Sequence, residues 1–263
     1  MSVTVLATPE PEHAPPRVRL DVTSTSDPEV TVTRTLASSG YRTTVRTTAN
    51  DRLALRSSGA TRTGVLYDYE APLGRTLRYS TLEDPARTHT PAELHPTRPA
   101  WLIRPGQPER SVPVRIREWG ERVREVTQGR HDVLGSDTTV VLTDGTRRVA
   151  DSFLIVRTET LAEADRLNAL LSDAAPLLLN VDADRGWTRV AYEFVAVGRV
   201  VERRTTDRNG SHPARLWELP YTVTRTPVGN TLTARDYADV LDEARDYAEL
   251  EDFYADYAAL EVG

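Results

Sequence analysis

Residues 153–181 read FLIVRTETLAEADRLNALLSDAAPLLLNV, and this stretch carries three secondary-structure signals in a row. A short apolar strand at 153–156 precedes the tetrapeptide TLAE at 160–163, which has the form of a helix capping box. Leucine and alanine then recur at helical spacing until Pro176 ends the pattern, and an apolar run follows. The stretch predicts a strand, one helix over residues 160–175 and a second strand.

Further strand candidates lie on both sides of this helix. They are short and rich in β-branched and apolar residues, and they occupy residues 112–116, 138–142, 190–201 and 216–223. Asp-Gly, Arg-Gly and Asn-Gly dipeptides separate them, as expected for tight turns. Because one helix accompanies so many strands, we expect a mostly antiparallel, split β-barrel with one packed α-helix over residues 98–228.

The N-terminal region also has the pattern of β-structure. Residues 18–22 and 30–32 alternate apolar and polar side chains, and short runs at 41–45 and 65–69 follow. The alternation predicts half-buried antiparallel strands. A Pro-Leu-Gly turn at 72–74 between two strands resembles the late strands of fibronectin type III and related immunoglobulin-like domains, so we expect a β-sandwich over residues 18–83.

Six prolines between Asp84 and Pro108 separate the two regions. This density excludes a helix and disfavours central strands. We therefore place a linker at residues 84–97 and an N-terminal arm at residues 1–17.

The C-terminal segment, residues 229–263, has a different character. From Thr231 onward it contains ten acids and two bases, a charge of −8 against −6 for the whole chain. The tripeptide Asp-Tyr-Ala recurs in it at a spacing of ten, which turns one helix through about 1000° and spreads the tyrosines around its axis. Short helical turns, each capped by an aspartate, fit better. The expected partner-docking residues are Tyr237, Val240, Tyr247, Leu250, Tyr257 and Leu260.

Composition excludes several functional classes. The chain has 263 residues, is 39% hydrophobic and has no apolar run long enough for a membrane span. It has no cysteine, and all 33 basic residues are arginine, which excludes thiol chemistry, a Schiff-base lysine and the lysine of a P-loop. The N-terminus has no apolar signal-peptide core. We expect no cofactor, no metal and no membrane span, and arginine-carboxylate contacts between subunits.

A catalytic interpretation has two starting points. Asp182 and Asp184 precede Trp187, a ring that could stack a sugar, but two aspartates before a strand are more typical of a turn. His131-Asp132 with Ser136 nearby has no Gly-x-Ser-x-Gly context and is more typical of a loop.

The histidines give no further site. No two of them have metal-ligand spacing, and His89 and His95 are expected to face solvent from the proline-rich segment. The sequence thus predicts a protein that is not an enzyme.

The sequence is compatible with two binding functions. A basic hairpin around Asn209-Gly210 could contact phosphate, but no series of aromatic residues accompanies it and the chain is acidic, so an interface is favoured over nucleic acid. Its residues are Arg203, Arg204, Arg208 and Arg215. Glycan binding by the sandwich, as an adhesin or receptor-binding module, would need an exposed aromatic platform, for which Tyr67, Tyr69 and Tyr79 are the candidates.

The order of elements in the second region carries a family resemblance. Trp101-Leu102-Ile103-Arg104-Pro105, the strand and helix of 153–171, Leu177-Leu178-Leu179 and Leu219-Pro220-Tyr221-Thr222-Val223 resemble minor tail proteins of actinobacterial siphophages, which are related to distal tail proteins. The short C-terminal aromatic repeats are similar too, although here every repeat has tyrosine where the family often has tryptophan. The domain order departs from that of many distal tail proteins, so receptor binding is not carried over to residues 20–83.

This resemblance implies a structural protein of the virion tail that is made in the host cytoplasm. It implies a hexameric homo-oligomeric ring at the tail tip, joining the tail tube to the distal tip or baseplate. The implied partners are the tail tube protein, a tail hub or tip protein and the tape measure protein.

Overall fold

The computed structural model describes most of the chain up to residue 225. The described residues are 3–46, 52–82, 91–124, 128–132, 139–143, 151–185, 192–205 and 212–225. Within them the protein is mainly β, with one α-helix, as the sequence predicts. None of the helices in this part of the chain is long and apolar enough to cross a membrane.

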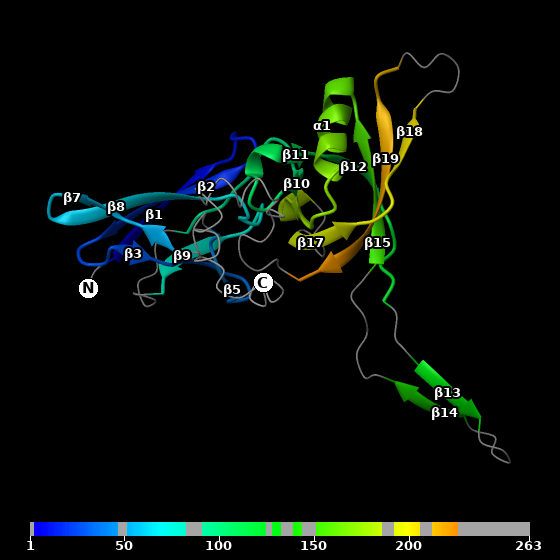
Figure 1. Ribbon diagram of the computed structural model, residues 1–263, viewed down its shortest axis with the longest axis horizontal. Coiled ribbons are helices and arrows are strands. Elements are labelled where there is room, and N and C mark those ends of the chain that lie inside the picture. The colour runs from blue at the N-terminus through cyan, green and yellow to red at the C-terminus, as the bar shows by residue number, and fades with distance from the viewer. Residues whose placement is uncertain are drawn as a thin grey trace, which may run out of the picture.

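The N-terminal half forms a sandwich of small antiparallel sheets (Figure 1). One sheet has the strand order β1-β2-β8-β7, a second has the order β5-β4-β9, and β3 pairs with β6. The strands are β1 (Val3–Glu10), β2 (Arg17–Ser24), β3 (Glu29–Val30), β4 (Val32–Leu36), β5 (Arg42–Thr44), β6 (Leu53–Ala54), β7 (Arg56–Ser58), β8 (Thr61–Asp68) and β9 (Leu77–Thr81). The alternating burial of β2, whose valines and leucine point inward, is the pattern that the sequence shows.

The second half is an eight-stranded sheet with the order β11-β10-β16-β17-β19-β15-β12, in which β18 also pairs with β19. Its strands are β10 (Ala100–Ile103), β11 (Val112–Pro113), β12 (Arg115–Trp119), β15 (Asp151–Thr158), β16 (Leu177–Val181), β17 (Tyr192–Val197), β18 (Val201–Arg204) and β19 (Arg215–Thr224). Two 3₁₀ turns, η1 (Pro108–Arg110) and η2 (Ala183–Arg185), connect them. The expected split barrel is an open sheet, because its end strands β11 and β12 do not pair with each other in the described residues.

The helix is α1 (Leu161–Leu171), and it packs on this sheet through Ala164, Leu167 and Leu170. Thr160 is the N-cap, since its hydroxyl accepts the amide proton of Glu163. The Glu163 carboxylate accepts from the Glu159 amide, one residue earlier than in an ideal capping box. The helix ends at Leu171, before Pro176.

The two halves share a core through the strands of the second sheet. Side chains alternate along β10: Trp101 and Ile103 pack with the sandwich, whereas Leu102 packs with α1. In β16 all five residues are buried, with Leu178 facing the sandwich and Leu179 the helix side. The three central strands β10, β16 and β17 are therefore covered on both faces.

Three segments that the sequence analysis places outside the domains, or treats as one strand, make defined contacts in the structure. The expected N-terminal arm contains β1, which pairs along its length with β2. In the expected linker, Ala92 and Leu94 are buried and Ala92 forms a bridge with Leu77. The long strand expected at 190–201 is divided into β17 and β18, and between them the Gly198 amide bonds to Pro220. The domain boundaries remain a prediction.

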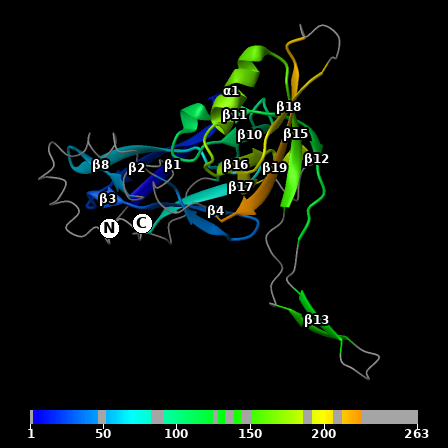
Figure 2. The same ribbon diagram turned by 45° about the vertical axis from the view of Figure 1, so that its right-hand side comes forward.

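One hairpin projects from the body. Strands β13 (Gln128–Asp132) and β14 (Thr139–Thr143) pair antiparallel with each other, and among the described strands they join no other sheet. Figures 1 and 2 both show the pair well away from the sandwich and from the eight-stranded sheet.

Candidate functional site

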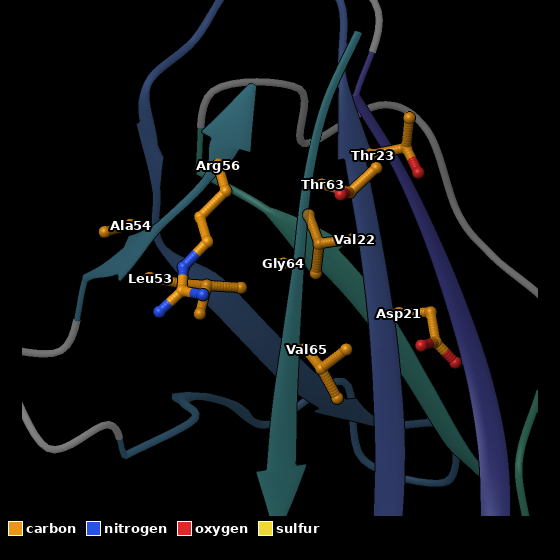
Figure 3. A pocket seen from close by; sticks show the side chains of 9 residues that line it. All are labelled: Asp21, Val22, Thr23, Leu53, Ala54, Arg56, Thr63, Gly64 and Val65. Atoms are coloured by element: carbon orange, nitrogen blue, oxygen red, sulfur yellow. The ribbon is translucent and has the colours of Figure 1, made fainter. Parts of the chain in front are cut away.

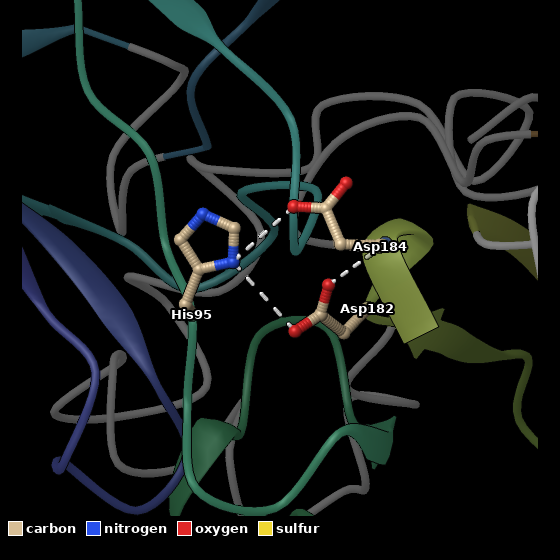
Figure 4. Close-up of side chains that lie close together, drawn as sticks. All are labelled: His95, Asp182 and Asp184. Carbon is tan, nitrogen blue, oxygen red and sulfur yellow. Dashed lines mark hydrogen bonds and ion pairs between the residues drawn. The ribbon is translucent and has the colours of Figure 1, made fainter. Parts of the chain in front are cut away.

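The first candidate is a cluster of His95, Asp182 and Asp184, which three distant segments bring together (Figure 4). His95 follows the buried Leu94, and alternation along this extended segment directs its side chain outward. Asp182 follows β16 directly, and its amide bonds to the Pro99 carbonyl at 2.7 Å. Asp184 lies two residues on, in the η2 turn.

The third segment is the turn at Gly74. Its φ of +62° is in the left-handed region, and a Cβ there would lie 2.2 Å from Asp182 Oδ1, so only glycine fits without rearrangement. The Gly74 amide bonds to Leu94 O at 3.0 Å, and the Ala183 amide bonds to Leu73 O at 3.4 Å. Backbone hydrogen bonds thus hold all three segments in place.

The two ring nitrogens of His95 face different carboxylates: Nδ1 faces Asp182 and Asp184, and Nε2 faces Glu93. Its Nδ1 is 3.7 Å from Asp182 Oδ2 and 3.7 Å from Asp184 Oδ2, and Nε2 is 3.5 Å from Glu93 Oε2. The side chain of Asp182 is 2% exposed, whereas His95 is 44% and Asp184 69% exposed. A hydrogen bond from the Thr76 hydroxyl and then one from His95 lower the pKa of Glu93.

This cluster changes the sequence interpretation of His95. The histidine is exposed, as the sequence predicts, but it also lies among three carboxylates because the Ala92–Leu94 segment packs into the core. The sequence signal was present in PAELHP at 91–96, where apolar and polar residues alternate as in a strand.

Among the described residues, the other candidates of the catalytic interpretation are not brought together in one site. Asp182 and Asp184 do form a turn after a strand, but Trp187 lies outside the described residues. His131 and Asp132 end β13, while Ser136 and His89 also lie outside the described residues.

The basic residues near the β18–β19 pair mostly face acids on the neighbouring strand. Arg203 donates to Glu218 Oε2 at 2.6 Å, and Arg215 Nε is 3.1 Å from Glu202 Oε1. Arg204 is exposed at the end of β18. Arg203 and Arg215 thus have acidic partners within the chain, and Arg208 lies outside the described residues.

A pocket of about 600 Å³ lies on the sandwich where β2 and β8 meet β6 and β7 (Figure 3). It is lined by Asp21, Val22, Thr23, Leu53, Ala54, Arg56, Thr63, Gly64 and Val65. None of these residues is aromatic, so the pocket has no ring on which a sugar could stack.

The candidate tyrosines for a glycan platform are engaged elsewhere. Tyr79 is buried, and its hydroxyl donates to Asp68 at 2.9 Å. The Arg17 guanidinium lies 3.9 Å from the centre of the Tyr67 ring and donates to the Tyr69 hydroxyl at 2.8 Å. These three tyrosines therefore contribute to packing and cation-π contacts.

A buried polar network lies at the junction of the two halves. Arg34 of β4 donates to both carboxylate oxygens of Asp68, at 2.7 and 2.8 Å, and to the Tyr192 hydroxyl of β17 at 3.0 Å. Burial opposes the charge of Arg34, but Asp68 outweighs it and raises the pKa of Arg34 above its ordinary value. Burial also raises the pKa of Tyr192 to about 12 and that of Tyr79 well above its usual range.

The docking residues expected in the acidic tail, Tyr237 to Leu260, lie outside the described residues. Their role stays a prediction.

The described elements define the class of the protein as a β-sandwich joined to an open β-sheet with one packed helix. No protein-family model matches the chain, and no curated protein matches it. Among solved structures it is similar to the Dit (gp 19.1) protein of SPP1, described as a paradigm of the hub adsorption apparatus in phages that infect Gram-positive bacteria. The identity is 12% and the TM-score 0.31.

This similarity covers 42% of the present chain and 44% of the Dit chain, so the match spans less than half of either protein. A likeness of this extent leaves the function to be argued from the residues themselves.

Proposed function

We propose that the protein is a structural component of a phage tail tip, which joins the tail tube to the distal tip or baseplate by assembling into a ring. The observation that carries this proposal is the β13–β14 hairpin. An isolated two-stranded hairpin is only marginally stable in water, because it has no second layer to bury its side chains. A hairpin that projects from the body and joins no other described sheet therefore suits a partner chain.

Repetition of that contact leads to a ring. When the hairpin of one copy binds a different surface of the next, the interface is heterologous, and such interfaces close into rings about one axis. Strands β11 and β12 are the two ends of the described eight-stranded sheet, and an end strand is where a sheet can be extended by a neighbouring chain. The sequence resemblance to minor tail proteins points to a hexamer.

Two further surfaces have roles in this proposal. Arg203, Arg204, Arg208 and Arg215 would contact acids of a neighbouring subunit. The acidic tail, through Tyr237, Val240, Tyr247, Leu250, Tyr257 and Leu260, would dock on a neighbouring subunit or on a tail hub, tail tube or tape measure protein. The glycan-binding alternative is not favoured, because neither the pocket nor the three tyrosines offers a stacking platform.

The test is the mass of the purified protein by light scattering, with negative-stain images of the same sample. We expect rings of about six subunits for the whole chain. Replacing residues 125–150 by a short Gly-Ser linker should give monomers that remain folded, with a β-type circular dichroism spectrum and cooperative thermal unfolding. Rings that persist in this variant would contradict the role of the hairpin, and a whole chain that stays monomeric at all concentrations would contradict self-assembly.

A further inference from the structure

We propose that His95, Asp182 and Asp184 bind a divalent first-row transition metal ion, such as Zn²⁺, at the junction of the two halves. The ligand types suit this class of ion: an imidazole nitrogen with two carboxylate oxygens favours zinc, cobalt or manganese, whereas magnesium and calcium prefer oxygen alone.

The spacing fits one ion between the three side chains. With bonds of about 2.1 Å to nitrogen and oxygen, neighbouring ligand atoms in a tetrahedral site stand about 3.4 Å apart. His95 Nδ1 is 3.7 Å from a carboxylate oxygen of each aspartate, and all three ligand atoms lie within 4.8 Å of one another. Asp184 is on the surface, so its side chain is free to close on the ion. The remaining position would be filled by water, since the cluster opens to solvent on the His95 side.

A second observation points to the same ligand. In metal sites the ligating histidine almost always offers its other ring nitrogen to a carboxylate, which fixes the tautomer and orients the ring. Here Nδ1 faces the two aspartates while Nε2 faces Glu93, and Glu93 is itself held by the Thr76 hydroxyl. With its proton on Nε2, the ring would direct the lone pair of Nδ1 at the ion.

The backbone also prepares the site. Asp182 is almost fully buried, and a carboxylate so far from water is stabilised by a cation as well as by hydrogen-bond donors. One donor is the Asp184 amide, which bonds to Asp182 Oδ1, while Oδ2 faces Nδ1 of His95 (Figure 4). The bound ion would link the His95 segment to the end of β16, and it would not contact the β13–β14 hairpin.

In the experiment, chelator-treated protein is titrated with Zn²⁺ in a calorimeter. Its thermal unfolding is then measured at increasing Zn²⁺ concentrations. We expect one saturable site and a rise in Tm with metal concentration, because a ligand that binds only the folded state stabilises it. Co²⁺ should give a visible absorption band, and Mg²⁺ should neither bind at this site nor compete with Zn²⁺.

Variants separate this site from other acids and histidines of the chain. His95→Gln and Asp184→Asn change exposed side chains, so both should fold and should lose the Zn²⁺ site and the cobalt band. Glu93→Gln should weaken Zn²⁺ binding about 10- to 100-fold. His212→Gln, at an exposed histidine in another part of the structure, is the matched control and should bind like the parent. Equal Zn²⁺ binding by His95→Gln and the parent, or absence of saturable binding in the parent, would overturn the proposal.

Discussion

The junction of the two halves and the β13–β14 hairpin differ in where their groups find partners. At the junction, Arg34 of β4 donates to Asp68 of β8 and to Tyr192 of β17, and Asn180 of β16 bonds to the segment before Gly74. The hairpin strands pair only with each other among the described strands. The junction groups thus find their partners within the chain, whereas the described hairpin strands have no partner strand in another described sheet.

The largest effect is expected from breaking the buried ion pair. Arg34→Met leaves Asp68 charged and buried, so the free energy of unfolding should fall by about 3–5 kcal/mol in chemical denaturation. Replacing both residues, with Arg34→Met and Asp68→Leu, should recover part of this loss because no lone charge remains. A loss below about 1 kcal/mol in the single variant would show that water reaches the pair.

A smaller loss is expected at Asn180, which is fully buried. Its side chain accepts from the Leu73 amide at 3.1 Å and donates to the Ala71 carbonyl at 2.9 Å. Asn180→Ala leaves both backbone groups without that partner, and the free energy of unfolding should fall by about 1–3 kcal/mol. Hydrogen exchange at the Leu73 amide should accelerate, while exchange in β2 should change only as much as the overall stability does.

Alkaline pH should weaken the same junction. The pKa of Tyr192 is raised to about 12 in the folded protein, and that of Tyr79 is raised as well, so the folded state holds these protons more tightly than the unfolded chain. The contribution of Tyr192 to stability is complete below pH of about 10 and is lost as pH rises toward about 12, and Tyr79 acts in the same direction. Tyr192→Phe should make the loss of Tm over this range shallower, and an unchanged slope would contradict the assignment.

The smallest effect is expected at the surface. The Arg203–Glu218 pair joins two well-exposed side chains, and such pairs contribute about 0–1 kcal/mol. Arg203→Ala should therefore leave Tm nearly unchanged. If light scattering then shows weaker assembly at equal stability, the residue acts between subunits, and normal assembly would remove Arg203 from the proposed interface.

Local patterns in the sequence predicted the elements well. Thr160 and Glu163 marked the start of the helix, and the leucine run after Pro176 marked strand β16, because these signals depend only on neighbouring residues. The same leucine run also indicates burial on both faces, yet it does not say which layers lie on either side. That depends on the pairing of β16 with β10 and β17, which is not encoded locally.

The site was predicted less well for the same reason. Asp182 and Asp184 were singled out as neighbours, but their partner His95 belongs to a segment that the prolines marked as a linker. The positive φ of Gly74 and the hydrogen bonds of its turn decide that these segments meet. Neither is visible in spacing or composition.

Strands β16 and β17, which both halves share, also affect the order in which the parts of the chain can fold during synthesis. Leu178 and Phe194 complete the hydrophobic core that Val18 and Leu20 begin, so the first eighty residues leave the ribosome with one wall of their core still missing. Contacts between residues so distant in sequence form slowly, because the intervening loop must close first. We therefore expect the sandwich to complete its packing only after β16 and β17 have been synthesised.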